Sequence, residues 1–346
     1  MGRPELVGTL PEFRGRGLVR VQFDEIHRWC EARNLLVQGI TGIPYFYWQF
    51  GYEFALALGG RRFGFKPPKL KESETESFSL RPATEEDIPF LVATYEYSRR
   101  RSGISAKWEA AYWHYHLIDM HPQNIHGREW RIIERSATHE AIGYVAFPDS
   151  LMGGGLTVTH FELQPGISWL EVTPAVMHAL WQVGQEYARL DGGSFETFGF
   201  SLGDGHPAYV AMGSLLPGQR DSYAWYLRVP DPVGFLKHIQ PVLERRVADS
   251  IAAGHSAEYL VGLYPKGFKL VLERGRLVAI EPWQPEHADH GNAGFPGLTF
   301  LQVLFGYRSF DELQRAFPDC WSDNDQTQLL FDILFPKRPS LVYGIS

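Results

Sequence analysis

The sequence predicts a mixed α/β or α+β protein in which several mixed sheets are flanked by helices. Short apolar segments alternate with longer segments whose apolar residues recur every three or four positions. This alternation begins near residue 7, begins again near residue 78, and changes after residue 230 to a long helical segment, a hairpin and further helices. With 346 residues, the chain is long enough for two or three domains.

The first element is a strand, loop and helix unit that starts at Val7–Arg20, written VGTLPEFRGRGLVR. Val7–Leu10 is predicted to be a strand, Arg14–Gly17 a basic loop, and Leu18–Arg33 a helix with one apolar face. The N–H groups at the start of a helix point outward, and the helix dipole favours negative charge there. We therefore predict a phosphate site in this loop, in preference to ordinary surface charge on its two arginines.

An aromatic segment follows the helix and a further predicted strand, Leu35–Ile40. Phe46–Tyr52 reads FYWQFGY, and Tyr52–Leu58 is predicted to be the next strand. Taken alone, these aromatic residues could simply be packed in a core.

The two motifs together resemble the GNAT acyl-CoA transferases. The cofactor loop of that family follows the pattern Val-x-Val-x-Pro, two residues, then Arg/Gln-x-x-Gly-x-Gly/Ala. This chain has Val7, Thr9, Pro11, Arg14, Gly17 and Val19 at the corresponding positions. Thr9 and Val19 depart from the pattern, and a bulky residue at the last position is similar to the enhanced intracellular survival (Eis) branch. FYWQFGY resembles the family's Phe-Tyr-x-x-x-Gly-Phe/Tyr signature.

The resemblance implies acetyl-CoA as the acyl donor and assigns roles to particular residues. The residues expected to bind it are Val7, Thr9, Arg14, Gly15, Arg16, Gly17, Leu18 and Val19. Tyr47 would donate a proton to the departing thiolate, because a phenol with a pKa of about 10 is protonated at neutral pH. The chain's own terminal carboxylate, at Ser346, is the implied base. Glu53 is another carboxylate near Tyr47, which we expect to be solvated.

The resemblance also predicts the domain organisation. Residues 1–65 would be a partial GNAT domain that carries the acyl-CoA site, and 66–77 a polar, proline-containing linker. Residues 78–230 would be a second GNAT-like domain, and 231–346 a sterol-carrier-like domain typical of Eis proteins. The first strands of the family are absent ahead of Val7. We expect N-terminal truncation, in preference to completion of the sheet by another segment or subunit.

The second GNAT-like domain is predicted to begin at strand Phe78–Arg81. Thr84 and Asp87 form a capping pair before a helix at Ile88–Arg101. The next predicted helix is Ala175–Arg189. The residues before it, Glu171–Pro174, lack the glycines and the arginine of a cofactor loop, so this domain is expected to be non-catalytic. In the sterol-carrier-like domain, Gly306, Arg308, Ser309 and Phe310 match a turn of the Eis proteins, and Ser309 is a predicted N-cap.

Composition limits the partners and the compartment. A net charge of −7 argues against nucleic-acid binding, and no run of Lys or Arg is long enough to reverse this. No apolar segment resembles a signal or a membrane span, so we expect a cytoplasmic protein without membrane attachment. Cys30 and Cys320 are expected to be packed thiols, and the histidines lack zinc-ligand spacing, so no metal is expected.

These observations lead to two hypotheses of different classes. The first is an acetyl-CoA-dependent N-acyltransferase, in which a primary amine of a small molecule or peptide attacks directly in a ternary complex. The Eis resemblance also implies a homo-oligomer, and the net negative charge of the chain favours electrostatic attraction of cationic acceptors. The second is a catalytically degenerate GNAT protein that acts as a CoA- or lipid-binding scaffold or sensor.

Overall fold

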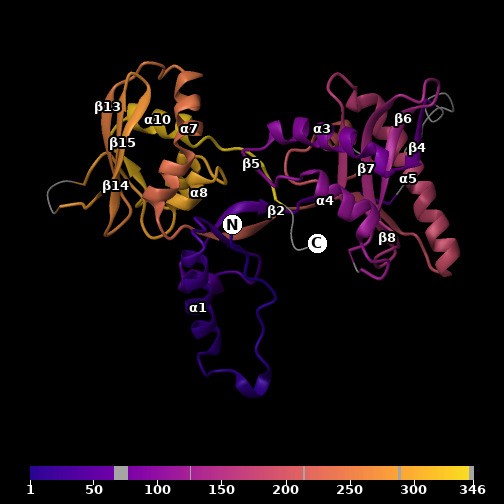
Figure 1. The fold of residues 1–346 in the computed structure, drawn as a ribbon, viewed down its shortest axis with the longest axis horizontal. Helices are drawn as coiled ribbons and strands as arrows, with labels where there is room; N and C mark the ends of the chain where they lie inside the picture. Colours follow the sequence, from indigo (N-terminus) through magenta and orange to yellow (C-terminus); the bar gives the residue numbers. More distant parts are fainter. Residues whose placement is uncertain (66–76, 125, 213–214, 287–289, 343–346) are drawn as a thin grey trace. The chain divides into compact units, whose positions relative to one another are not determined.

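The structure, a computed structural model, describes residues 1–65, 77–124, 126–212, 215–286 and 290–342 (Figure 1). The chain divides into two compact units. The first unit combines Met1–Leu56 with Ala224–Arg338, and the second combines Ala57–Tyr223 with the segment that begins at Pro339.

The N-terminal part of the first unit is built on a three-stranded sheet in the order β1-β12-β2. Its elements in chain order are η1 (Pro11–Phe13), α1 (Leu18–Ala32), β1 (Gln38–Ile40), η2 (Phe46–Phe50), β2 (Glu53–Leu58) and, much later, β12 (Tyr223–Arg228). β12 pairs antiparallel with β1, with Gln38 opposite Arg228. The helix and both strands that follow it confirm the sequence prediction.

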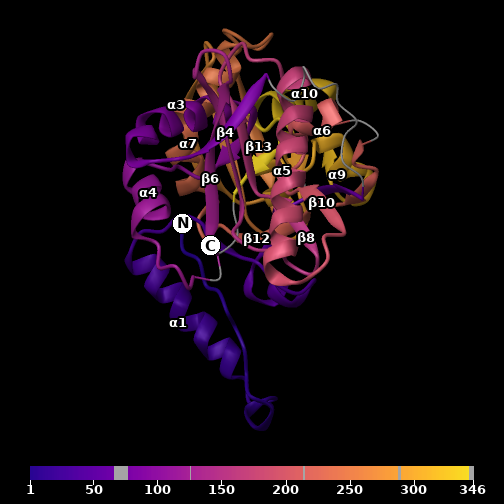
Figure 2. The same cartoon turned by 90° about the vertical axis from the view of Figure 1, so that its right-hand side faces the viewer.

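The strand predicted at Val7–Leu10 is wrong, because this segment contains no strand. On the side of β1 away from β12, the recorded pairing is a single parallel bridge between Gly2 and Gln38. Leu6 then adopts a positive φ of 57°, which ends the extended run. The segment therefore leaves the sheet as a loop, and α1 returns beside it (Figures 1 and 2).

The remainder of the first unit is a five-stranded sheet in the order β15-β14-β13-β16-β17, accompanied by helices. Its elements are α7 (Pro232–Ala248), β13 (Ala257–Gly262), β14 (Gly267–Glu273), β15 (Arg276–Trp283), β16 (Ala293–Gly294), α8 (Phe300–Leu304), α9 (Phe310–Ala316), β17 (Trp321–Ser322) and α10 (Asp325–Leu334). The predicted N-cap Ser309 is confirmed, since its hydroxyl accepts from the Glu312 N–H in a complete capping box.

The second unit contains two four-stranded sheets, in the orders β4-β6-β7-β9 and β11-β3-β10-β8, and a small β18-β5 pair. The strands are β3 (Arg61–Gly64), β4 (Phe78–Pro82), β5 (Ile104–Ser105), β6 (Arg128–Arg135), β7 (Ala141–Pro148), β8 (Gly155–Val158), β9 (His160–Leu163), β10 (Thr197–Phe200), β11 (Gly218–Arg220) and β18 (Ser340–Leu341). The helices are η3 (Glu85–Asp87), α3 (Ile88–Ser98), η4 (Arg99–Arg101), α4 (Ala110–His114), η5 (Tyr115–Asp119), α5 (Trp169–Asp191) and α6 (Pro207–Met212). The predicted capping pair of Thr84 and Asp87 is confirmed.

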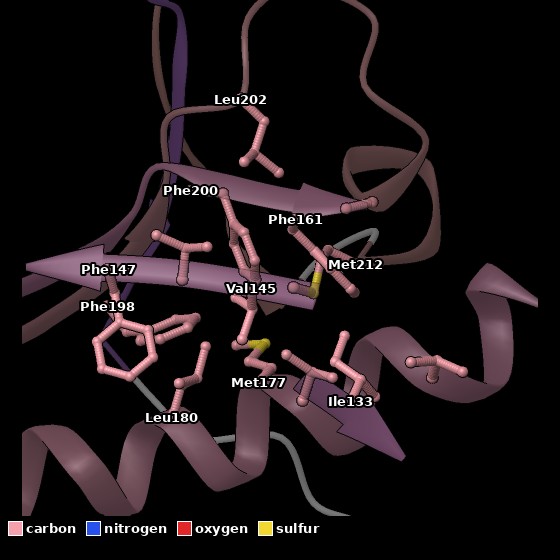
Figure 3. Packing of buried hydrophobic residues seen from close by; sticks show 14 of the residues in the cluster. Ile133, Val145, Phe147, Phe161, Met177, Leu180, Phe198, Phe200, Leu202 and Met212 are labelled. Atoms are coloured by element: carbon pink, nitrogen blue, oxygen red, sulfur yellow. The ribbon is translucent and has the colours of Figure 1, made fainter. Parts of the chain in front are cut away.

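The core of this unit lies between α5 and the strands that it covers (Figures 2 and 3). Met177 and Leu180 of α5 meet Val145 of β7 and Phe198 of β10, all fully buried. The predicted start of this helix at Ala175 is wrong, because α5 begins at Trp169 and includes Glu171–Pro174. Pro174 is the sixth residue of α5 and so lies inside the helix, where its ring nitrogen has no proton to donate to the carbonyl of Leu170.

Candidate functional site

A cavity of about 690 Å³ opens within the N-terminal part of the first unit. Its walls come from the N-terminal segment, the start of α1, the loop after β1, η2, and the basic loop Arg14–Gly17, which we call the glycine loop. All the predicted acyl-CoA-binding residues line it, together with Tyr47. Two motifs separated in sequence thus meet at one cavity, whose volume is in the range of about 300–1,000 Å³ that is common for small-molecule sites.

The glycine loop has the backbone geometry that an anion site needs. Gly15 and Gly17 adopt left-handed φ angles of 73° and 74°, and a Cβ at either would meet open space. The glycines are thus required by backbone conformation and not by crowding. Gly17 is the N-cap of α1, and no side chain caps this helix end. The N–H groups of the first turn therefore remain available to a ligand.

Three arginines make this side of the cavity electropositive. Nε of Arg14 donates to the Thr9 carbonyl at 3.3 Å, and the guanidinium of Arg16 lies 5.4 Å from the Phe13 ring centre. Arg20 donates to Oε1 of Gln49 at 2.9 Å. Within the described ranges, none of these arginines forms an ion pair with a carboxylate. Their positive charge can therefore attract an anionic group.

Tyr47 stands in η2 with only 5% of its surface exposed. Its ring is enclosed by Phe23, Phe46 and Tyr226, at centroid distances of 5.7, 5.1 and 5.5 Å. Gly42 packs against the same ring, since a Cβ there would overlap the ring carbon Cε2. The phenol is thus held in one position at the cavity wall, as both the packed-aromatic and the proton-donor interpretations require.

Glu5 is a cavity residue that the sequence interpretation missed. Its Oε2 accepts a hydrogen bond from the Thr41 hydroxyl at 3.1 Å, while the buried Oε1 has no hydrogen-bond partner and lies 3.9 Å from the guanidinium of Arg3 in a long ion pair. Among the described residues that line the cavity, Glu5 is the acidic one. Its position two residues before Val7 was the available signal, because a residue so close to a binding motif is held against the same site.

Glu53 is not solvated, contrary to the sequence expectation. It is 5% exposed, and burial raises the pKa of its carboxyl group. Hydrogen bonds from the Phe54 N–H and from the side chains of Trp48 and Gln302 oppose that rise. The other carboxylate predicted from the sequence, that of Ser346, lies outside the described residues.

A second polar group that the sequence did not reveal lies behind Tyr47. His27 of α1 contacts the Tyr52 hydroxyl at 3.1 Å, and this hydroxyl donates to Oε1 of Gln38 at 3.3 Å. Burial, together with the smaller effect of the positive charge of Arg228, lowers the pKa of His27 to about 4. The imidazole is therefore neutral at physiological pH and joins α1 to Tyr52, the residue that precedes β2.

The described ranges, with their gaps, contain no cluster of three or more His, Cys, Asp or Glu side chains arranged to hold a metal ion. No helix within those ranges is long and apolar enough to span a bilayer. Cys30 and Cys320 are buried free thiols, as predicted.

Comparison with known proteins identifies solved structures of similar architecture. No family model and no curated protein sequence matches the chain. A GCN5-related N-acetyltransferase from Kribbella flavida aligns over 99% of this chain and 80% of its own, with 16% identity and a TM-score of 0.60. The chain has the GCN5-related N-acetyltransferase fold.

Two further solved structures of this GNAT fold extend the likeness. A probable N-acyltransferase from Enterococcus faecalis matches 99% of this chain and 81% of its own, with 15% identity and a TM-score of 0.65. Eis1 from Mycobacterium abscessus matches 98% of this chain and 81% of its own, with 16% identity and a TM-score of 0.54. The predicted Eis-like GNAT fold, with mixed sheets flanked by helices, is thereby confirmed.

Proposed function

We propose that the chain is an acetyl-CoA-dependent N-acyltransferase, in which a primary amine attacks the thioester directly while both substrates are bound. The cavity that joins the electropositive glycine loop to Tyr47 and Glu5 carries this proposal. The fold shared with N-acetyltransferases supports the same class of reaction.

Binding of the donor would fall to the glycine loop and the start of α1. The first-turn N–H groups and the guanidinium groups of Arg14 and Arg16, which line the cavity, would hold the pyrophosphate, and the backbone of Val7–Thr9 would hold the thioester arm. Acetyl-CoA supplies the activated acyl group when it is bound. The protein's contribution is to orient that group toward the attacking amine.

The proton balance would be met by Glu5 and Tyr47. As the nitrogen–carbon bond forms and the carbon–sulfur bond breaks, Glu5 accepts a proton from the attacking nitrogen. Tyr47 gives its phenol proton to the departing sulfur, and solvent then restores both groups. The terminal carboxylate of Ser346 is the rival base that the resemblance implies.

A cationic acceptor fits the charges and the rings around the cavity. Glu5 supplies a negative charge, and Phe46 supplies an aromatic ring that can attract an ammonium group, whereas the rings of Phe13 and Phe50 already carry the guanidinium groups of Arg16 and Arg20. The net charge of −7 favours the same class of molecule, which includes polyamines, aminoglycosides and lysine side chains. We also propose the homo-oligomer that the Eis resemblance implies, and light scattering would measure the molecular mass of the assembly.

The first test is calorimetric titration of acetyl-CoA into the full chain, followed by a thiol-release assay over those amines. Micromolar binding with amine-dependent thiol release is expected. Binding without turnover for any amine would favour the degenerate scaffold instead. A folded chain that does not bind acetyl-CoA would refute the proposal.

The role of Tyr47 is tested by Tyr47→Phe, which keeps the packed ring and removes the hydroxyl. We expect kcat to fall by about 10²–10⁴-fold, the usual contribution of a positioned acid, with unchanged acetyl-CoA affinity. An unchanged kcat would mean that Tyr47 is only a packed aromatic.

The role of Glu5 is tested by Glu5→Gln, which removes the charge and leaves an oxygen to accept from Thr41. The variant should lose most of its kcat. Deletion of Ser346, which displaces the terminal carboxylate by one residue, is the comparison. If the deletion abolishes turnover and Glu5→Gln does not, the base is the terminal carboxylate.

A further inference from the structure

Glu53 is an unusual residue to find buried at the start of β2. A carboxylate removed from water costs several kcal/mol unless it is paired or hydrogen-bonded, so its partners must compensate for burial. Glu53 does not line the cavity, and it therefore contacts neither substrate in the proposed reaction. Its burial calls for another explanation.

The first set of contacts joins Glu53 to the turn that carries Tyr47. Oε1 of Glu53 accepts from the indole N–H of Trp48 at 3.1 Å and from the Phe54 N–H at 2.8 Å. Trp48 directly follows Tyr47 in η2. The carboxylate thus fixes the short helix η2 to the strand that follows it.

The second set of contacts reaches α8 and the turn that follows it. The buried side chain of Gln302 hydrogen-bonds to Glu53, and the positive charge of Arg308 acts on the same carboxylate. The carbonyl of Gln302 accepts from the N–H groups of Tyr307 and Arg308, at 2.9 and 3.1 Å. One residue thus holds the turn that presents Arg308 and also contacts Glu53.

We propose that Glu53 and Gln302 form a positioning contact that keeps η2, and with it the Tyr47 phenol, in the arrangement needed for acyl transfer. The segment from α8 to α9 then influences the reaction without touching a substrate. This inference rests on the proposed function of Tyr47. Apolar residues would fill the same space at a lower cost in desolvation, whereas a hydrogen-bonded pair fixes one geometry.

Gln302→Met tests the contact, because it removes the amide, keeps a similar length and leaves Glu53 in place. The matched control is Gln240→Met, whose amide bonds instead to the Leu277 carbonyl and to Glu244. We expect Gln302→Met to lower kcat by roughly tenfold to a hundredfold, as displaced catalytic groups do, with no change in the KM for acetyl-CoA. Gln240→Met should leave both constants unchanged.

Two further measurements separate positioning from general damage. In the Tyr47→Phe background, Gln302→Met should cause no additional loss of rate, since the phenol proton is already absent. In ¹⁵N-labelled protein, the indole N–H resonance of Trp48, assigned with Trp48→Phe, should shift in Gln302→Met and Glu53→Gln but not in Gln240→Met.

The outcomes are distinguishable. Additive losses in the double variant, or an unmoved Trp48 resonance in Gln302→Met, would overturn the positioning contact. A wild-type chain without acyl transfer, or a fully active Tyr47→Phe, would overturn the proposed function and with it the catalytic part of this inference. The Trp48 resonance would still decide whether the contact itself orders η2.

Discussion

Gly42→Ala should disable the reaction while leaving the predicted phosphate loop intact. The added Cβ would overlap Cε2 of Tyr47, so the ring must move by roughly 1 Å to regain van der Waals contact. A misplacement of that size can reduce the rate by about a hundredfold. The enclosing rings of Phe23 and Tyr226 oppose the movement, so overpacking should also cost about 1–3 kcal/mol of stability.

The assay is thiol release with separate determination of kcat and the KM for acetyl-CoA. We expect kcat to fall and KM to stay near its wild-type value, because the glycine loop is untouched. Gly193→Ala is the control, since a Cβ at Gly193 meets open space and its φ is not in the left-handed range. A Gly42→Ala enzyme with normal kcat would show that the position of the Tyr47 ring does not matter.

Two other predictions concern charge. Arg14→Ala and Arg16→Ala should each raise the KM for acetyl-CoA by about tenfold, the value of one hydrogen bond to a charged group, and leave the KM for the amine unchanged. The control is Arg28→Ala, because Arg28 lies on the exposed side of α1 and pairs with Glu25 at 2.9 Å; it should change neither KM. Equal effects in all three variants would contradict the assignment of Arg14 and Arg16 to acetyl-CoA binding. Because the pKa of His27 is lowered from 6.5 to about 4, the unfolded chain binds more protons in that interval. The stability that neutral His27 provides above pH 6.5 should therefore be lost as the pH falls toward 4, and the urea midpoint of His27→Gln should depend less on pH than that of the wild type.

Elements with a strong local signal could be predicted from the sequence. The apolar face of α1 and the capping pairs at Thr84 and Ser309 are set by residues within one or two helical turns. Val7–Leu10 could not be predicted, because its apolar residues fit a strand and the positive φ of Leu6 leaves no mark in the sequence. Likewise, Pro174 indicated a helix boundary, although it fits inside the first turns of α5.

The candidate site divides in the same way. The glycines and arginines of the loop follow a recognisable pattern, so the sequence was sufficient to single them out. Glu5, Glu53 and His27 became interpretable only through contacts with Thr41, Gln302 and Tyr52, which lie far from them in the chain. A carboxylate or imidazole carries no sequence mark of burial, and its environment is a property of the folded unit.

The pairing of β1 with β12 has a consequence for the order of events during synthesis. Gln38 and Arg228 are neighbours in the sheet although 190 positions separate them in the chain. Contacts of such high sequence separation form slowly, because a long loop must close before they are gained. A ribosome must therefore translate through residue 228 before β1 acquires this partner, whereas most strands of the second unit are complete by then. Arrested nascent chains ending before β12 should consequently leave the N-terminal part of the first unit accessible to proteases while the second unit already resists them.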